Sequence, residues 1–180
     1  MKLYTYIALI LILSGLKLDA QDPQVSQFYA SPTLLAPSMA GTTSGSRMGL
    51  NFRDQWPAIP GAFITYTLTF DHYFPGMRSG VGLIFLKDRA GTGKLSTSNV
   101  GLQYSYSIPV NRSLEIRPGL QLYYSQRNAY FYAHTFSDQI SFNGIAPVTS
   151  ETSVFEKAGY MDFATSVFVF TPDYWGGMVL

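Results

Sequence analysis

The sequence predicts an all-β protein, an antiparallel transmembrane β-barrel of the outer-membrane type. Apolar and polar residues alternate with a period of two along many segments, and only 13% of the 180 residues are charged. A period of two places alternate side chains on opposite faces of a strand. Typical globular chains carry about 25% charged residues. Low charge and an aromatic content of 16% therefore indicate an outer surface that meets lipid between aromatic girdles.

The clearest predicted element is a long hairpin over residues 99–124. Apolar side chains occupy one parity of both strands, and the short connection at 109–112 makes the strands antiparallel neighbours. A tilted strand needs roughly 9–11 residues to cross a bilayer. Spanning strands must close into a barrel, because unpaired backbone groups are costly in lipid. The other parity carries the residues that we expect to face a wet lumen: Gln103, Glu115, Arg117 and Gln121.

The rest of the chain is predicted in order from the same alternation. Pro32 and Pro37 indicate that residues 21–45 form an irregular periplasmic lead-in or luminal segment, because proline removes a backbone donor. The predicted strands then cover residues 47–55, 62–70, 80–87, the two strands of the hairpin, 160–170, and a last strand that starts near 174.

The connections suggest an orientation for this barrel. If the first strand runs outward, the short connections at 109–112 and 171–173 are periplasmic and the long segment 126–159 is external, as in bacterial barrels. About seven strands is an odd number and falls below the eight of the smallest bacterial single-chain barrels. We therefore expect an incomplete N-terminal half of a longer barrel, with closure by another chain as the less favoured alternative.

Export is expected from the first twenty residues. Lys2 is followed by an apolar stretch over 3–13, and Leu18, Asp19 and Ala20 form a passable cleavage site. The apolar stretch is shorter than the ~20 residues that a spanning helix needs. We therefore predict a signal peptide over 1–20 and a partial outer-membrane barrel domain over 21–180.

Composition and motifs predict neither catalysis, nor a cofactor, nor a metal site. The chain has no Cys, and its net charge of +1 comes from scattered basic residues, which argues against a nucleic-acid surface. His72 and His134 lack an acidic or histidine partner at metal-ligand spacing. No Gly-x-Ser-x-Gly elbow is present.

The turn at residues 56–61 is the sharpest local feature. An exposed Trp beside prolines could form a preorganised docking site for a partner. It could instead belong to the outer aromatic girdle, which is the interpretation we favour. The candidates for partner contact or loop structure are Arg53, Gln55, Trp56, Pro57 and Pro60.

Charged residues at the lumen parity raise a second question. Arg53, Glu115 and Arg117 could pair with one another or with a plug, although packing into the wall is the commoner outcome. Near the bilayer midplane, Arg in place of Leu102 or Leu120 should cost roughly 2–4 kcal/mol, because those side chains are expected to face lipid. The same change at the lumen-facing glutamines of the hairpin is expected to cost much less.

Several stretches carry a resemblance to a known family: residues 21–29, 51–63, 66–74, 95–106 and 114–126. They resemble the PorP/SprF family, outer-membrane proteins linked to the type IX secretion system of Bacteroidota. The run Gln-Trp-Pro-Ala-Ile-Pro-Gly at 55–61 is the most specific match. The resemblance covers essentially the whole mature chain. It implies that family members form barrels with about twice as many strands as this chain.

The resemblance implies a non-enzymatic accessory barrel in the outer-membrane lipid. Such a barrel would help a partner, such as an adhesin or gliding-type surface protein, to leave through the secretion machine. It would contact periplasmic and lipoprotein subunits of that machine. Two alternatives remain open on the residues alone: an outer-membrane porin or small-solute channel, and a soluble exported β-sandwich.

Overall fold

A computed structural model describes residues 31–58, 61–91, 95–129, 135–141, 144–145, 150 and 157–180. The predicted signal peptide at 1–20 lies outside the described residues, as do His134 and Pro60. In the described part of the chain, no helix has the length and apolar character needed to cross a membrane.

The fold is all-β, as predicted. One antiparallel sheet runs in the order β1-β2-β3-β4-β6-β9-β10, and the short strand β5 pairs with β6. The bounds of its strands are β1 Ser46–Gln55, β2 Phe63–Phe74, β3 Ser79–Ala90, β4 Leu95–Tyr106, β5 Ile108–Pro109, β6 Glu115–Asn128, β9 Lys157–Phe170 and β10 Trp175–Val179. The long connection between β6 and β9 holds a separate two-stranded sheet of β7 (Ile140–Ser141) and β8 (Gly144–Ile145), after the short 3-10 helix η5 (Ser137–Gln139).

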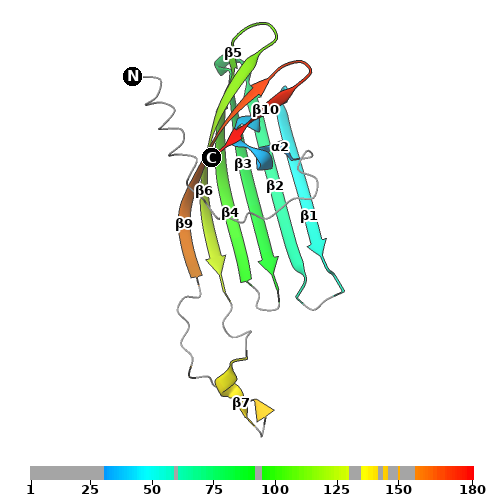
Figure 1. The fold of residues 1–180 in the computed structure, drawn as a ribbon, viewed down its shortest axis with the longest axis vertical. Helices are drawn as coiled ribbons and strands as arrows, with labels where there is room; N and C mark the ends of the chain where they lie inside the picture. The colour runs from blue at the N-terminus through cyan, green and yellow to red at the C-terminus, as the bar shows by residue number, and fades with distance from the viewer. Residues whose placement is uncertain are drawn as a thin grey trace, which may run out of the picture.

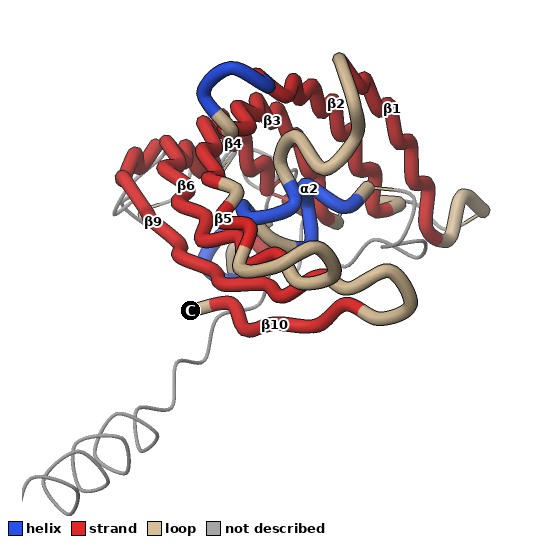
Figure 2. Tube along the Cα trace, turned by 90° about the horizontal axis from the view of Figure 1, so that it is seen from above, coloured by secondary structure: helices blue, strands red, loops and turns tan. Residues whose placement is uncertain are grey.

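The main sheet is curled into a half-barrel. Figure 1 shows the long strands side by side, with β7 beyond one end of the sheet and β5 at the other. Viewed from above, the strands follow an arc that encloses the short helix α2 (Pro32–Leu35) (Figure 2). Within the described residues, β1 and β10 are the two edges of the sheet and do not pair with each other.

Several strands extend beyond their predicted ends. β2 continues through Phe74, and its last residue pairs with Ser79 of β3 across the short 3-10 helix η3 (Pro75–Met77). β4 begins at Leu95 and β6 ends at Asn128, so their ladder is longer than the predicted hairpin. The lead-in also differs from the prediction, because it contains α2 and the 3-10 helix η2 (Pro37–Met39). Proline is compatible with the first position of a helix, and both short helices use it there.

The two faces of the half-barrel differ in a way that soluble sheets do not show. Apolar side chains on the convex face are exposed, with Leu102 at 52% and Leu50 at 76%. Polar side chains on the concave face are buried, including Gln103 at 0% and Asp71 at 1%. The period of two along each strand separates the two sets.

Residues 31–41, here called the inner segment, lie against the concave face. They comprise α2, η2 and the residues around them, and Figure 2 shows α2 inside the arc of strands. Ala36 and Met39 of this segment pack with Phe168 of β9 in the small apolar core. The remaining contacts of the inner segment are mainly polar, and they form the candidate site.

Candidate functional site

Glycines on the concave face allow the backbone of the inner segment to approach the sheet closely. A Cβ added to Gly80 of β3 would overlap the carbonyl oxygen of Ala40, and one added to Gly119 of β6 would overlap the backbone nitrogen of Ser38. Gly41 has a φ of +66°, and a Cβ there would lie 2.6 Å from the Cα of Gly80. These glycines are required because a larger residue would hold the two backbones apart.

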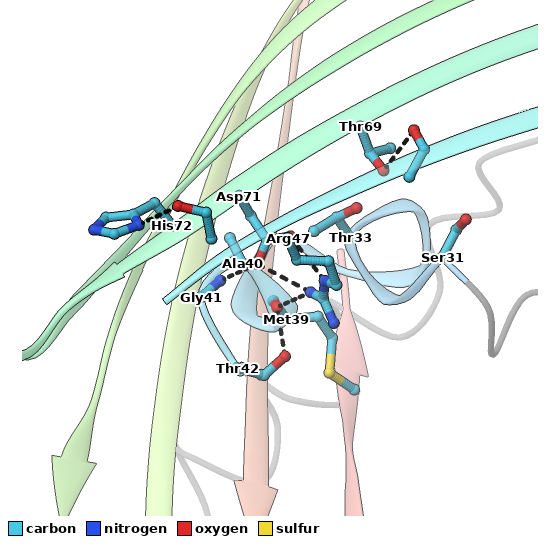
Figure 3. A network of polar contacts seen from close by, with 12 residues as sticks. Ser31, Thr33, Met39, Ala40, Gly41, Thr42, Arg47, Thr69, Asp71 and His72 are labelled. Carbon is cyan, nitrogen blue, oxygen red and sulfur yellow. Dashed lines mark hydrogen bonds and ion pairs between the residues drawn. The ribbon is translucent and has the colours of Figure 1, made fainter. Parts of the chain in front are cut away.

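One anchor of the inner segment is a buried carboxylate on β2 (Figure 3). Asp71 accepts a hydrogen bond of 2.7 Å from the backbone N–H of Gly41. The same carboxylate accepts two hydrogen bonds from Arg47 of β1, at 2.8 Å from Nε and 3.0 Å from Nη2. Arg47 Nη2 also donates to the carbonyl oxygen of Met39 at 3.3 Å. A paired and fully hydrogen-bonded carboxylate is the form in which a charge tolerates burial.

A second anchor comes from the opposite part of the arc. Arg117 of β6 is buried, and its Nη2 donates to the carbonyl oxygens of Gly41 at 3.0 Å and Ala40 at 3.3 Å. Its Nε lies 3.5 Å from a carboxylate oxygen of Glu115, and its guanidinium carbon lies 5.6 Å from the centre of the Tyr73 ring. Arg117 thus pairs both with Glu115 and with the inner segment, so the wall-packing outcome favoured from sequence is not what the structure shows.

A pair of glutamines lies against the inner segment, and one of them bonds to it directly. Gln103 of β4 donates from Nε2 to the carbonyl oxygen of Thr33 at 2.7 Å and also to Oε1 of Gln121 on β6. Both glutamines are buried, with exposed fractions of 0% and 7%. Gln103 is fully buried and bonded to the inner segment, so we expect an arginine there to cost more than the sequence alone suggested.

Further hydrogen bonds reach the inner segment from β1, β4 and β9. Asn51 of β1 donates from Nδ2 to Ser31 Oγ at 2.6 Å. Ser166 Oγ of β9 accepts from the backbone N–H of Ser38 at 2.9 Å. In β4, Ser105 Oγ donates to the carbonyl oxygen of Ala40 at 2.7 Å. The inner segment is therefore bonded to β1, β2, β4, β6 and β9 together, which fixes it along the arc.

The turn after β1 is a separate feature, at the end of β1 opposite the Arg47–Asp71 pair. Trp56 is 56% exposed and has a φ of +61°, a left-handed backbone that bulky residues rarely adopt. Its ring meets the ring of Phe63 edge-on, with 5.6 Å between centroids. Arg53 donates to Gln55 Oε1 at 2.6 Å, so these two candidates lie together on the concave side of β1.

Comparison with protein families decides the identity of the chain. The family model described as "Type IX secretion system membrane protein PorP/SprF" matches residues 17–180. The chain belongs to the PorP/SprF family. The family is one of secretion-system membrane proteins, not of enzymes. No curated protein and no solved structure matched the chain.

In this PorP/SprF chain the predicted site residues fall into two groups. Gln103, Arg117 and Gln121 come together around the inner segment, and Glu115 joins them through Arg117. The candidates near Trp56 lie at the other end of β1, away from this network, and Pro60 lies outside the described residues.

Sequence reasoning missed Arg47 and Asp71, although both are essential to the anchoring. A signal was present, because each is a charged residue at the polar parity of its strand. Gly80, Gly82 and Gly119 gave a second signal, since glycine at that parity in nearby strands marks a close backbone approach.

Proposed function

We propose that the chain is an accessory barrel component of the outer membrane that supports type IX secretion or surface display of a partner protein, acting by protein–protein contacts. The partner would be an adhesin or gliding-type surface protein of a Bacteroidota cell. Periplasmic and lipoprotein subunits of the machine would be further contacts. A signal peptide at 1–20 would direct export, and 21–180 would form the barrel domain, without a cofactor and without nucleic acid.

The observation that carries the proposal is the combination of an apolar convex face with a concave face against which the inner segment is hydrogen-bonded. Exposed apolar side chains such as Leu102 and Leu120, both at 52%, suit contact with outer-membrane lipid. The inner segment occupies the place where a porin keeps a water channel, and Arg47 and Arg117 hold it there. This filling favours a scaffold for protein contacts over the alternative of a small-solute channel.

Partner contact is proposed at the turn after β1, with Arg53, Gln55, Trp56, Pro57 and Pro60 as candidates. Backbone strain of about 1–3 kcal/mol is typical of a residue held in a sparsely populated region, and such residues cluster at functional sites. Trp56 has this backbone, is exposed, and belongs to a residue type that is enriched in interface hot spots. Gln103, Glu115, Arg117 and Gln121 would support the barrel from its lumen.

Deletion of the gene tests the proposed function. We expect loss of surface display of a specific exported protein with unchanged uptake of small solutes. Normal display in the deletion strain would refute the proposal. Conductance in planar bilayers separates the channel alternative, because a steady open pore formed by the purified chain would favour transport instead.

A further inference from the structure

A hollow of about 280 Å³ opens on the concave face between the inner segment and strands β3, β4, β6, β9 and β10. This volume far exceeds the roughly 10–15 Å³ that one water needs and approaches the lower end of ligand sites, about 300 Å³. Leu34 and Leu35 of the inner segment and Leu86 of β3 contribute apolar lining. Asn99 of β4 and Asp162 of β9 contribute polar lining, so the hollow is amphipathic.

Two polar residues of the hollow, Asp162 and Asn99, carry side-chain oxygens that no cation neutralises within the described residues. Asp162 is exposed, and among the residues that the structure describes its Oδ1 accepts one hydrogen bond, from the N–H of the neighbouring Phe163 at 2.8 Å. Within the part of the chain that the structure describes, Asp71 and Glu115 pair with arginines, whereas Asp162 has no ion-pair partner. Asn99 Oδ1 also has no hydrogen-bond partner there. Among the described residues that line the hollow there is no lysine or arginine.

We propose that this hollow binds a lysine or arginine side chain of a partner polypeptide. The alkyl stem would pack on Leu34 and Leu35, and the cationic head would reach Asp162. Lysine offers three N–H donors and arginine five, with no acceptor, which suits the carboxylate of Asp162. Long basic side chains commonly bury their stems along apolar surface while the charged head stays near water.

Charge complementarity selects this occupant among the alternatives. An acidic side chain would meet the carboxylate of Asp162 and be repelled, and a purely apolar one would leave that carboxylate without a cation. The basic residues of the concave network do not compete, because Arg47 and Arg117 are bound to carboxylates and to the inner segment. The proposal deepens the proposed function, on which it rests, by giving the chemistry of one partner contact.

Binding of labelled pentapeptides to the full chain in detergent micelles tests the proposal. One peptide has a central lysine between alanine and serine residues, and the matched peptide has norleucine, which keeps the stem and removes the charge. Fluorescence anisotropy should show the lysine peptide binding about two- to five-fold more tightly, as expected for an exposed ion pair. Raising the salt should reduce this preference.

Single substitutions test whether the preference for the lysine peptide arises at the hollow. Asp162→Asn should abolish it, whereas the control Asp173→Asn, on the exposed turn between β9 and β10, should leave it unchanged. Ala164→Leu places a larger side chain in the lining and should weaken both peptides. Equal binding of the two peptides by the unmodified chain, or an unchanged preference in Asp162→Asn, would overturn the proposal. Undiminished binding of both peptides by Ala164→Leu would also overturn it. These measurements use the purified chain without the secretion machine. They can therefore refute the binding of a basic side chain even if the deletion experiment supports the proposed function.

Discussion

The convex and concave faces of the half-barrel are built from the same strands, but the convex face exposes apolar side chains and the concave face buries polar ones. Leu102 and Gln103 are neighbours in β4, yet the apolar residue is 52% exposed and the polar one is 0% exposed. In water this arrangement would be unfavourable, because about 25 cal/mol is lost for each Å² of apolar surface left exposed. The exposed convex face therefore suits an apolar surrounding, whereas the polar concave face is satisfied by the inner segment.

The difference extends to the source of specificity on each face. The convex face needs only apolar side chains, so many substitutions that keep an apolar residue there should be tolerated. The concave face has individual partners for its polar atoms, such as Asp71 with Gly41 and Gln103 with Thr33. A change there leaves a buried polar group without a partner, which is expensive.

Removal of the Asp71 carboxylate is expected to have the largest effect. Asp71→Ala leaves Arg47 and the N–H of Gly41 without their acceptor, and breaking a buried pair costs about 3–5 kcal/mol. Because the Arg47 side chain is 27% exposed, we expect the low end, about 3 kcal/mol. Urea unfolding in lipid vesicles measures the loss. Asp173→Ala on the exposed turn is the control, and equal losses would show that the carboxylate does not anchor the inner segment.

A charge on the convex face should have an effect of similar size. Leu102→Arg places a guanidinium against hydrocarbon, and we expect a loss of about 2–4 kcal/mol if the site is near the midplane. Asp162→Arg is the matched control, because Asp162 is also exposed but lies on the concave face. Folding yield into vesicles reports both. Similar yields would mean that the two faces have the same surroundings.

Crowding the glycine contact should have the smallest effect of the three. Gly119→Ala adds a Cβ that overlaps the backbone of Ser38, and overpacking typically costs about 1–3 kcal/mol. Gly176→Ala in β10 serves as the control, because nothing lies within 4 Å of its added Cβ. The same urea titration applies. A Gly119→Ala protein as stable as the control variant would show that the inner segment does not pack closely on β6.

The sequence predicted the sheet well because the alternation of apolar and polar residues can be recognised within each strand separately. The alternation of Leu102 with Gln103, and of Leu120 with Gln121, is local, and it placed these residues on the correct faces of their strands. Strand ends were predicted less well: β2 continues beyond Asp71, because ladder pairing with β3 extends the strand past the last clearly alternating residue.

The inner segment could not be predicted in the same way. Its position depends on contacts between residues far apart in the chain, such as Arg117 with Gly41, and no local period records them. Pro32 and Pro37 indicated an irregular segment, whereas the structure shows that each begins a short helix. The charged residues and glycines on the concave faces of the strands indicated that something packs there. Without the strand order, the sequence did not show that the inner segment is what they contact.

Lipid contact at single positions tests the central claim most directly. The chain has no cysteine, so one introduced cysteine carries a fluorescent label at a unique site. We predict that labels at Leu102→Cys and Leu120→Cys are quenched by nitroxide-bearing lipids in vesicles, whereas a label at Asp162→Cys is not. Equal quenching at all three positions, or quenching at Asp162→Cys alone, would contradict a convex face in lipid and a concave face that holds polypeptide.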